Sequence, residues 1–229
     1  MTIDPEQFRN EIKSKPHWKI IVSPTIFDEN MISSLKECNN IISKSQVRIG
    51  LYEFPENRIG KHINIKNSIV YSENDDTNVQ WAFFTSGQFV YLSSFFEDNR
   101  EALLSQTTSE ISGFTNLMNT IYKIGLSLEF IVRMYSNLRE KINTITITYH
   151  EKNINKRKIY NDYSEVMFRP SGKTHTNEIE YKLEISLSDL FSDRVSQMVK
   201  ILAYVFEQYQ INIDEHFIRT HIDKFFRER

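Results

Sequence analysis

The fold is decided by the stretch TTSEISGFTNLMNTIYKIGLSLEFIVRMYSNLR, which runs from Thr107 to Arg139. Thr107 and Glu110 have the spacing of a capping box, in which side chains accept hydrogen bonds from backbone N–H groups that a first helical turn leaves free. The stretch predicts one helix over 107–139, long enough at ~1.5 Å per residue to cross a domain. Its apolar positions alternate in steps of three and four, the period of an amphipathic helix: Ile111, Phe114, Met118, Ile121, Gly125, Leu128, Val132 and Tyr135.

Strand patterns lie on both sides of this helix. A hairpin is predicted around Thr85-Ser86-Gly87, with Trp81, Phe83, Phe89 and Tyr91 on one face. The other expected strands are Trp18–Val22, Val47–Phe54, Ser68–Ser72 and, as an antiparallel meander, Ile142–Tyr149, Arg157–Tyr160, Val166–Arg169 and Glu178–Ser186. Two amphipathic helices close the chain. The predicted fold class is α+β, with antiparallel sheets packed on a long central helix and two C-terminal helices.

Composition points to one compact unit. A chain of 229 residues that is 40% hydrophobic can bury a full core, so we expect a single domain over 1–229, with sub-halves 1–106 and 140–229 joined by helix 107–139. The net charge of −2 gives no global basic field. No apolar run is long enough for a membrane span, and Met1-Thr-Ile-Asp-Pro5 lacks a signal pattern. We therefore expect a cytoplasmic protein that does not contact a membrane.

Motifs for cofactors and metals are incomplete. The single cysteine, Cys38, excludes a disulfide framework and has the helical spacing of a buried hydrophobe. The six glycines form no dinucleotide fingerprint, and Gly172-Lys173-Thr174 lacks the first glycine of a phosphate-binding loop, because Met167 holds that position. His150-Glu151 lacks the second histidine of a zinc-protease helix. We expect no cofactor, no metal and no catalytic residues.

One catalytic alternative stays open. Metal-dependent nucleases can place an Asp and a Glu-x-Lys on adjacent strands, where the carboxylates hold Mg²⁺ and the lysine steadies the attacking water. Asp162 with Glu180-Tyr181-Lys182 matches that pattern. The alternation of Glu178, Glu180, Lys182 and Glu184 also describes the solvated face of a strand.

Basic residues gather at the expected meander loops. Such side chains can neutralise phosphates and give salt-dependent binding. Interleaved acidic residues such as Glu151 and Glu165 also fit an ordinary solvated hairpin tip. The candidate nucleic-acid-binding residues are Lys152, Lys156, Arg157, Lys158, Arg169 and Lys173.

Several stretches carry a family resemblance. They are Val47-Arg48-Ile49-Gly50 with Phe54-Pro55, the run WAFFTSGQFVY from Trp81 to Tyr91 with Glu97-Asp98, and Tyr122 with Glu129-Phe130. From about Trp18 onward the chain resembles the C-terminal companion region of bacterial proteins that begin with a Schlafen-type AlbA-like DNA-binding domain. The AlbA-like domain itself is absent from this sequence. Glu56 follows Pro55 where that family commonly has histidine.

The resemblance implies a companion domain that senses or docks. We expect a non-catalytic accessory or regulatory subunit that docks on partner proteins in a bacterial DNA-associated complex, serving anti-phage or anti-plasmid defence. The expected partner is an SMC-like ATPase or a nuclease subunit, and DNA is reached through the complex. The alternatives are a metal-dependent nuclease and a stand-alone nucleic-acid-binding protein.

Overall fold

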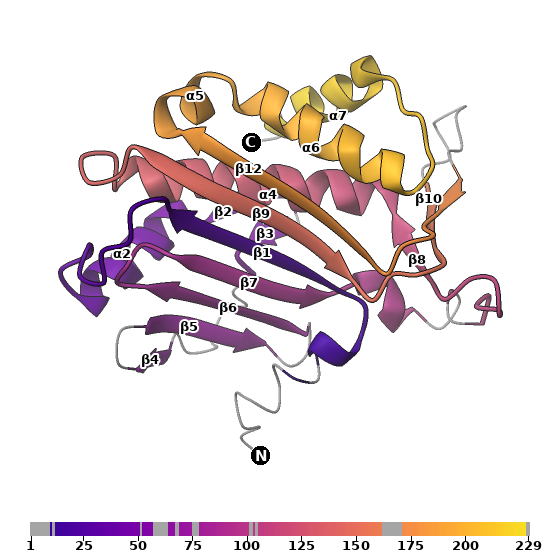
Figure 1. Cartoon of the computed structure of the whole chain (residues 1–229), viewed down its shortest axis with the longest axis horizontal. Coiled ribbons are helices and arrows are strands. Elements are labelled where there is room, and N and C mark those ends of the chain that lie inside the picture. The colour runs from indigo at the N-terminus through magenta and orange to yellow at the C-terminus, as the bar shows by residue number, and fades with distance from the viewer. Residues whose placement is uncertain are drawn as a thin grey trace.

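The chain is built around one large antiparallel sheet. The computed structural model describes residues 10, 12–50, 52–56, 64–66, 69–74, 78–100, 103, 105–161 and 171–227. In these residues a seven-stranded sheet has the order β12-β9-β1-β7-β6-β5-β4 (Figure 1). Its strands in chain order are β1 His17–Pro24, β4 Asn64–Lys66, β5 Ile69–Asn74, β6 Val79–Phe84, β7 Phe89–Ser94, β9 Thr144–Lys152 and β12 Glu178–Ser186.

Strands from both predicted sub-halves belong to this sheet. β1 pairs with β7 on one side, where Ile20 lies opposite Tyr91, and with β9 on the other, where Ile20 lies opposite Tyr149. β1 precedes the long helix in the chain. It therefore joins β7, which also precedes that helix, to β9, which follows it.

The long helix is present, but it begins later than the sequence pattern predicts. It is α4, Leu117–Ser136, and Asn116 caps it by accepting hydrogen bonds from the N–H groups of Met118 and Asn119 at 2.9 and 3.2 Å. The predicted capping box at Thr107 is wrong, because Glu110 N–H instead bonds Thr108 Oγ1 within a turn. The next residues form β8, Gly113–Asn116, which pairs in parallel with β10, Arg157–Tyr160.

β10 is not part of the predicted meander, because it pairs with β8 instead of with β9 or β12. It joins a three-stranded sheet with β8 and with β11, Gly172–Lys173, while β9 and β12 pair directly with each other. The predicted strand at 166–169 lies outside the described residues. A further two-stranded sheet pairs β2, Val47–Ile49, with β3, Tyr52–Phe54.

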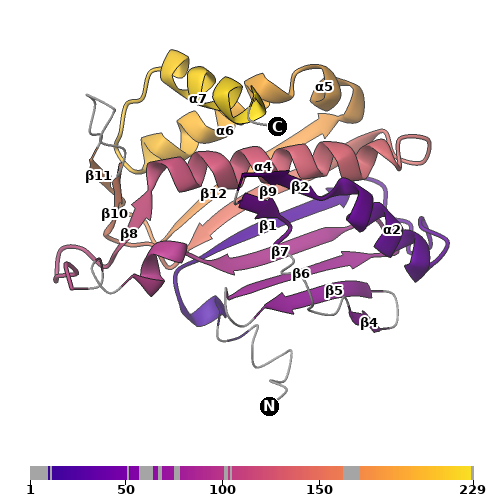
Figure 2. The ribbon, with the colours of Figure 1, turned by 180° about the vertical axis from the view of Figure 1, so that it is seen from behind.

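The remaining helices complete the α+β fold that the sequence predicts. They are α2 Leu35–Ser45, the short 3-10 helix η1 Phe96–Asn99, α5 Leu187–Ser192, α6 Arg194–Gln208 and α7 Glu215–Arg227. α4 crosses one face of the sheet. α6 and α7 lie alongside α4, beyond the β12 edge of the sheet (Figure 2). None of the helices in the described part of the chain has the length and apolar content that crossing a bilayer requires.

The predicted hairpin is confirmed in its register. Trp81 lies opposite Tyr91 and Phe83 opposite Phe89, and all four side chains are buried. Gly87 in the turn has a φ of +77°, a left-handed conformation that glycine adopts without strain. Tyr135 of α4 donates a 2.7 Å hydrogen bond to the Gly87 carbonyl, which fixes the helix against the turn.

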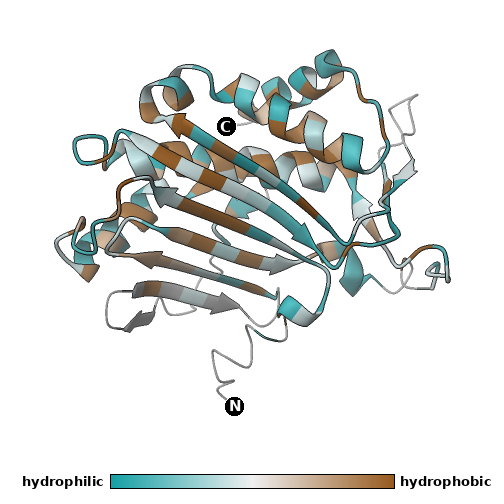
Figure 3. Cartoon of the chain, viewed as in Figure 1, coloured by the Kyte–Doolittle hydropathy of each residue, from teal (hydrophilic) through white to brown (hydrophobic). Residues whose placement is uncertain are grey.

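The other side of the sheet, here called the outer face, has a different character. Glu178, Glu180, Lys182 and Glu184 of β12 are exposed on it, and the threonines of β9 are partly exposed. Teal residues accordingly dominate β12 in Figure 3. A short helical turn at residues 12–14 lies against this face, and its Ile12 packs on Leu92. No longer helix of the described part of the chain lies there (Figure 1).

Candidate functional site

The predicted basic residues do not form one patch. Lys152 lies at the end of β9 on the outer face and pairs with Glu178 at 3.2 Å. Lys158 and Lys173 lie opposite each other on β10 and β11 of the smaller sheet. Lys156 precedes β10, and its ammonium donates to the Ser109 carbonyl at 2.8 Å. Arg169 lies outside the described residues.

Arg157 is buried, contrary to its place in the predicted nucleic-acid surface. Its guanidinium donates to both carboxylate oxygens of Asp98 at 2.8 and 3.1 Å and to Thr115 Oγ1 at 2.7 Å. It also donates to the Phe114 carbonyl and lies 3.8 Å from the centroid of the Phe95 ring. Because these contacts occupy the guanidinium inside the protein, Arg157 holds β8, β10 and η1 together.

A buried carboxyl group extends this network. The Tyr209 hydroxyl, after α6, donates to Glu151 Oε2 at 2.6 Å and lies 3.2 Å from Thr115 Oγ1. Glu151 Oε1 has no hydrogen-bond partner among the described residues. Burial raises the pKa of Glu151 to about 7, although the Tyr209 hydrogen bond and the Arg157 charge oppose that rise. Glu151 therefore titrates near neutral pH inside the core.

Gly172 has a packing role in the same region. A Cβ atom at this position would overlap the carbonyl oxygen of Tyr209. The residue thus lets β11 approach the end of α6 closely, which explains a glycine here without a bound phosphate.

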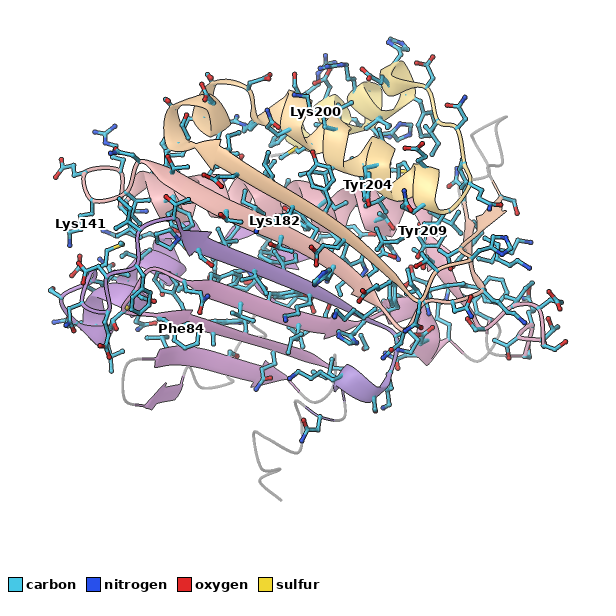
Figure 4. The ribbon with its side chains drawn as sticks, viewed as in Figure 1. Phe84, Lys141, Lys182, Lys200, Tyr204 and Tyr209 are labelled. Atoms are coloured by element: carbon cyan, nitrogen blue, oxygen red, sulfur yellow. The ribbon has the colours of Figure 1, made fainter. Side chains whose placement is uncertain are left out.

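Glu180 and Lys182, of the nuclease alternative, are exposed on the outer face of β12. Lys182 is labelled there in Figure 4. The Glu180 carboxylate pairs with His150 Nε2 on the neighbouring β9 strand. Asp162 lies outside the described residues. Within the described residues no three histidine, cysteine, aspartate or glutamate side chains are grouped to hold a metal ion.

A second polar cluster joins α4 to the sheet beside Glu56. The Lys123 ammonium donates to the Tyr91 hydroxyl at 2.7 Å, to Glu56 at 3.1 Å and to Ser93 at 3.4 Å. Burial opposes the charge of Lys123, but Tyr91 and Glu56 outweigh it, so its pKa lies above the usual range. Since an ammonium has three protons, these partners saturate it. The cluster therefore links α4 to β7 by hydrogen bonds.

A broad depression lies on the outside of α6 and on its connection to α7, lined in part by Lys200, Tyr204 and Ile213. Figure 4 labels Lys200 and Tyr204 on α6. The depression is open to solvent, unlike the concave sites that enclose small ligands. Tyr204 is engaged in packing there, with its ring centroid 5.2 Å from that of Tyr181 on β12.

Of the large apolar side chains in the described residues, the two most exposed are neighbours in one loop. Ile26 and Phe27 are 78% and 79% exposed, in the loop of residues 25–30 between β1 and α2. We call this segment the Ile26–Phe27 loop. Sequence reasoning missed it, although an Ile-Phe pair between Pro24 and the polar run Asp28-Glu29-Asn30 is an unusual composition for a loop.

Hydrogen bonds fix both ends of the Ile26–Phe27 loop. At its start, Thr25 donates to the Thr144 carbonyl through its N–H at 3.1 Å and its hydroxyl at 3.2 Å. At its end, the Thr85 hydroxyl donates to the Glu29 carbonyl at 2.8 Å. Lys141 donates to the Met31 carbonyl just beyond, at 2.9 Å. The loop thus presents its two apolar side chains from an anchored backbone.

No protein-family model, no curated protein and no solved structure matches the chain. The resemblance to the AlbA-like companion region therefore stays a prediction.

Proposed function

We propose that this protein is a non-catalytic accessory subunit that docks on a partner protein through the Ile26–Phe27 loop. The observation that supports the proposal is the near-complete exposure of two large apolar side chains on a loop that is anchored at both ends. Adjacent exposed apolar side chains mark interaction sites more often than isolated ones do.

The energetics of docking favour this loop. Burying a phenylalanine or isoleucine side chain contributes about 1.5–3 kcal/mol. An anchored backbone loses little further entropy on binding, so more of that contribution remains as affinity. Asp28 and Glu29 beside the pair are exposed and acidic. The loop therefore fits an apolar pocket with a basic rim on the partner.

The resemblance to the AlbA-like companion region supplies the class of partner. In this proposal the partner is an SMC-like ATPase or a nuclease subunit of a bacterial DNA-associated defence complex, and it carries the chemistry.

Co-purification tests the proposal. Tagged wild-type protein, expressed with its neighbouring genes, should recover an ATPase or nuclease subunit. The Ile26→Ser/Phe27→Ser variant should bind the same subunit at least ~30-fold more weakly, because truncating an interface anchor costs about 2 kcal/mol or more. Its melting temperature should stay close to that of the wild type, since both side chains are exposed.

Phe96→Ser is the matched control, because Phe96 is 67% exposed but lies on η1, outside the Ile26–Phe27 loop. It should bind the partner as the wild type does. Equal loss in both variants, or a wild-type protein that purifies alone at low salt, contradicts the proposal.

A further inference from the structure

A basic cluster lies at the start of β1, and of its residues only Lys152 was among the nucleic-acid-binding residues predicted from the sequence. It consists of Lys13, Lys19 and Lys152, and we call it the β1 basic cluster. His17 lies beside these lysines but is buried, and burial lowers the pKa of its imidazole. In the sequence its signal is a basic residue at every second position: Lys13, Lys15, His17 and Lys19. Strand alternation applies only to His17 and Lys19, because β1 begins at His17 and residues 12–14 form a helical turn.

The register puts the β1 basic cluster on the outer face. Trp18 and Ile20 point into the core, being 3% and 0% exposed, so His17 and Lys19 point the other way. His17 lies opposite Lys152, and Lys19 opposite His150.

The backbone that carries Lys13 lies against the same face. Ile12 packs on Leu92 of β7. The Asn153 amide donates to the carbonyls of Lys13 and Lys15 at 2.9 and 3.1 Å. The backbone that carries Lys13 is therefore fixed beside β1.

The positive charges of this cluster are only partly compensated. Lys152 pairs with Glu178 at 3.2 Å, but the ammonium groups of Lys13 and Lys19 have no hydrogen bond or ion pair in the described part of the chain. Burial lowers the pKa of Lys19, and the charges of Lys152 and Lys13 lower it further, against the charge of Glu180. An anion placed among these lysines would offset their mutual repulsion.

The surroundings of the cluster indicate the kind of anion. Lys13 is exposed and Lys19 and Lys152 are half-buried, while their outer-face neighbours Leu92 and His150 are buried. One step further along the strands, Ile21, Val90 and Ala82 form a partly exposed apolar row on the same face. Sites for single-stranded nucleic acid combine cations that follow the phosphate backbone with exposed side chains, most often aromatic, on which the bases lie. Here the surface offered to the bases is aliphatic.

We propose that Lys13, Lys19 and Lys152 bind the phosphate groups of a single-stranded nucleic acid, with its bases over Ile21 and Val90. This site is separate from the proposed docking loop. The two lie at opposite ends of β1, about 25 Å apart at ~3.3 Å per residue.

Fluorescence anisotropy on the full chain tests the proposal. The probe is a labelled single-stranded oligonucleotide of about 12 nucleotides in about 50 mM salt. The wild type should bind it, with a logarithmic salt slope near −2 from about three phosphate contacts. The triple variant Lys13→Gln/Lys19→Gln/Lys152→Gln should lose at least about tenfold in affinity and most of that slope.

The triple variant Lys156→Gln/Lys158→Gln/Lys173→Gln is the matched control, because it removes the same charge from the smaller sheet. It should bind nearly as the wild type does. Lys13→Gln alone, at an exposed position, should give an intermediate loss without affecting folding.

Four outcomes would overturn the proposal. The first is no binding by the wild type, and the second is equal losses in the two triple variants. The third is tighter binding of a duplex than of the single strand. The fourth is competition by inorganic phosphate as effective as that of unlabelled oligonucleotide at equal phosphate concentration, which would assign the site to free phosphate.

Discussion

Glu151 shows how an acidic residue of an ordinary-looking strand end can control stability. Its carboxyl group is 1% exposed, and only one of its oxygens has a hydrogen-bond partner in the described structure. Ionisation would leave a negative charge in a low-dielectric site, and this cost raises the pKa of Glu151 to about 7. The unfolded chain keeps the ordinary value of 4.5.

The pH dependence of stability follows from that difference. Between pH 4.5 and 7 the unfolded chain has lost the Glu151 proton and the folded chain has kept it. Rising pH therefore lowers the contribution of Glu151 to the free energy of unfolding, by about 1.4 kcal/mol per pH unit across this window. Urea denaturation of wild type and Glu151→Gln at several pH values measures it. The wild type should lose stability relative to Glu151→Gln as the pH rises from 4.5 to 7 and should lose no more above 7; a constant difference between the two would contradict the assignment.

Arg157 should act on stability rather than on binding. Arg157→Met leaves Asp98 and the Phe114 carbonyl without their donor, and we expect a loss of about 3 kcal/mol in the free energy of unfolding. Lys158→Met, one residue further along β10, should change it by less than about 0.5 kcal/mol. Denaturant titration compares the two; a neutral Arg157→Met would show that the buried ion pair is dispensable.

Sequence could place these residues on strands but could not choose their partners. The pattern correctly predicted that Cys38 is buried and that the β12 charges are solvated. The pattern could not show that Arg157 is buried, unlike the lysines beside it. The burial of Arg157 depends on Asp98 and Thr115, which are distant in sequence.

At the scale of elements, the start of α4 is set by a pairing between distant strands and not by the local sequence pattern. Ile111 and Phe114 continue the helical period, yet residues 113–116 form β8. The pairing of β8 with β10 brings together segments about forty residues apart, as in Thr115 opposite Ile159, and no local pattern reports it. The helix begins where that pairing ends.

The cap of α4 can be tested directly. Asn116→Ala removes the acceptor for two N–H groups of the first turn, so we expect a loss of about 1–2 kcal/mol. Thr107→Ala, at the exposed position where the sequence pattern put the cap, should change the free energy of unfolding by less than about 0.5 kcal/mol. Thermal or urea unfolding distinguishes the two; equal losses would put the start of the helix in doubt.

At the scale of the molecule, one central strand organises both proposed surfaces. β1 is bonded to β7 and β9 along its length, which gives the sheet its rigidity there. The β1 basic cluster stands at its start and the Ile26–Phe27 loop at its end. A rigid strand between two contact sites suits a subunit that positions a nucleic-acid strand relative to a partner protein.

The sequence predicted the α+β class, the hairpin and the long helix, since each has a local period. It could not predict that β1 joins strands from both halves. Register between distant strands depends on which apolar faces meet in the core.

Hydrogen–deuterium exchange on the co-purified complex tests docking most directly. Docking through the Ile26–Phe27 loop should slow exchange in residues 25–33 and in the contacting turn at 85–88, while α6 and α7 exchange as in the free protein. Slowed exchange over α6 and α7 with an unchanged Ile26–Phe27 loop would contradict it.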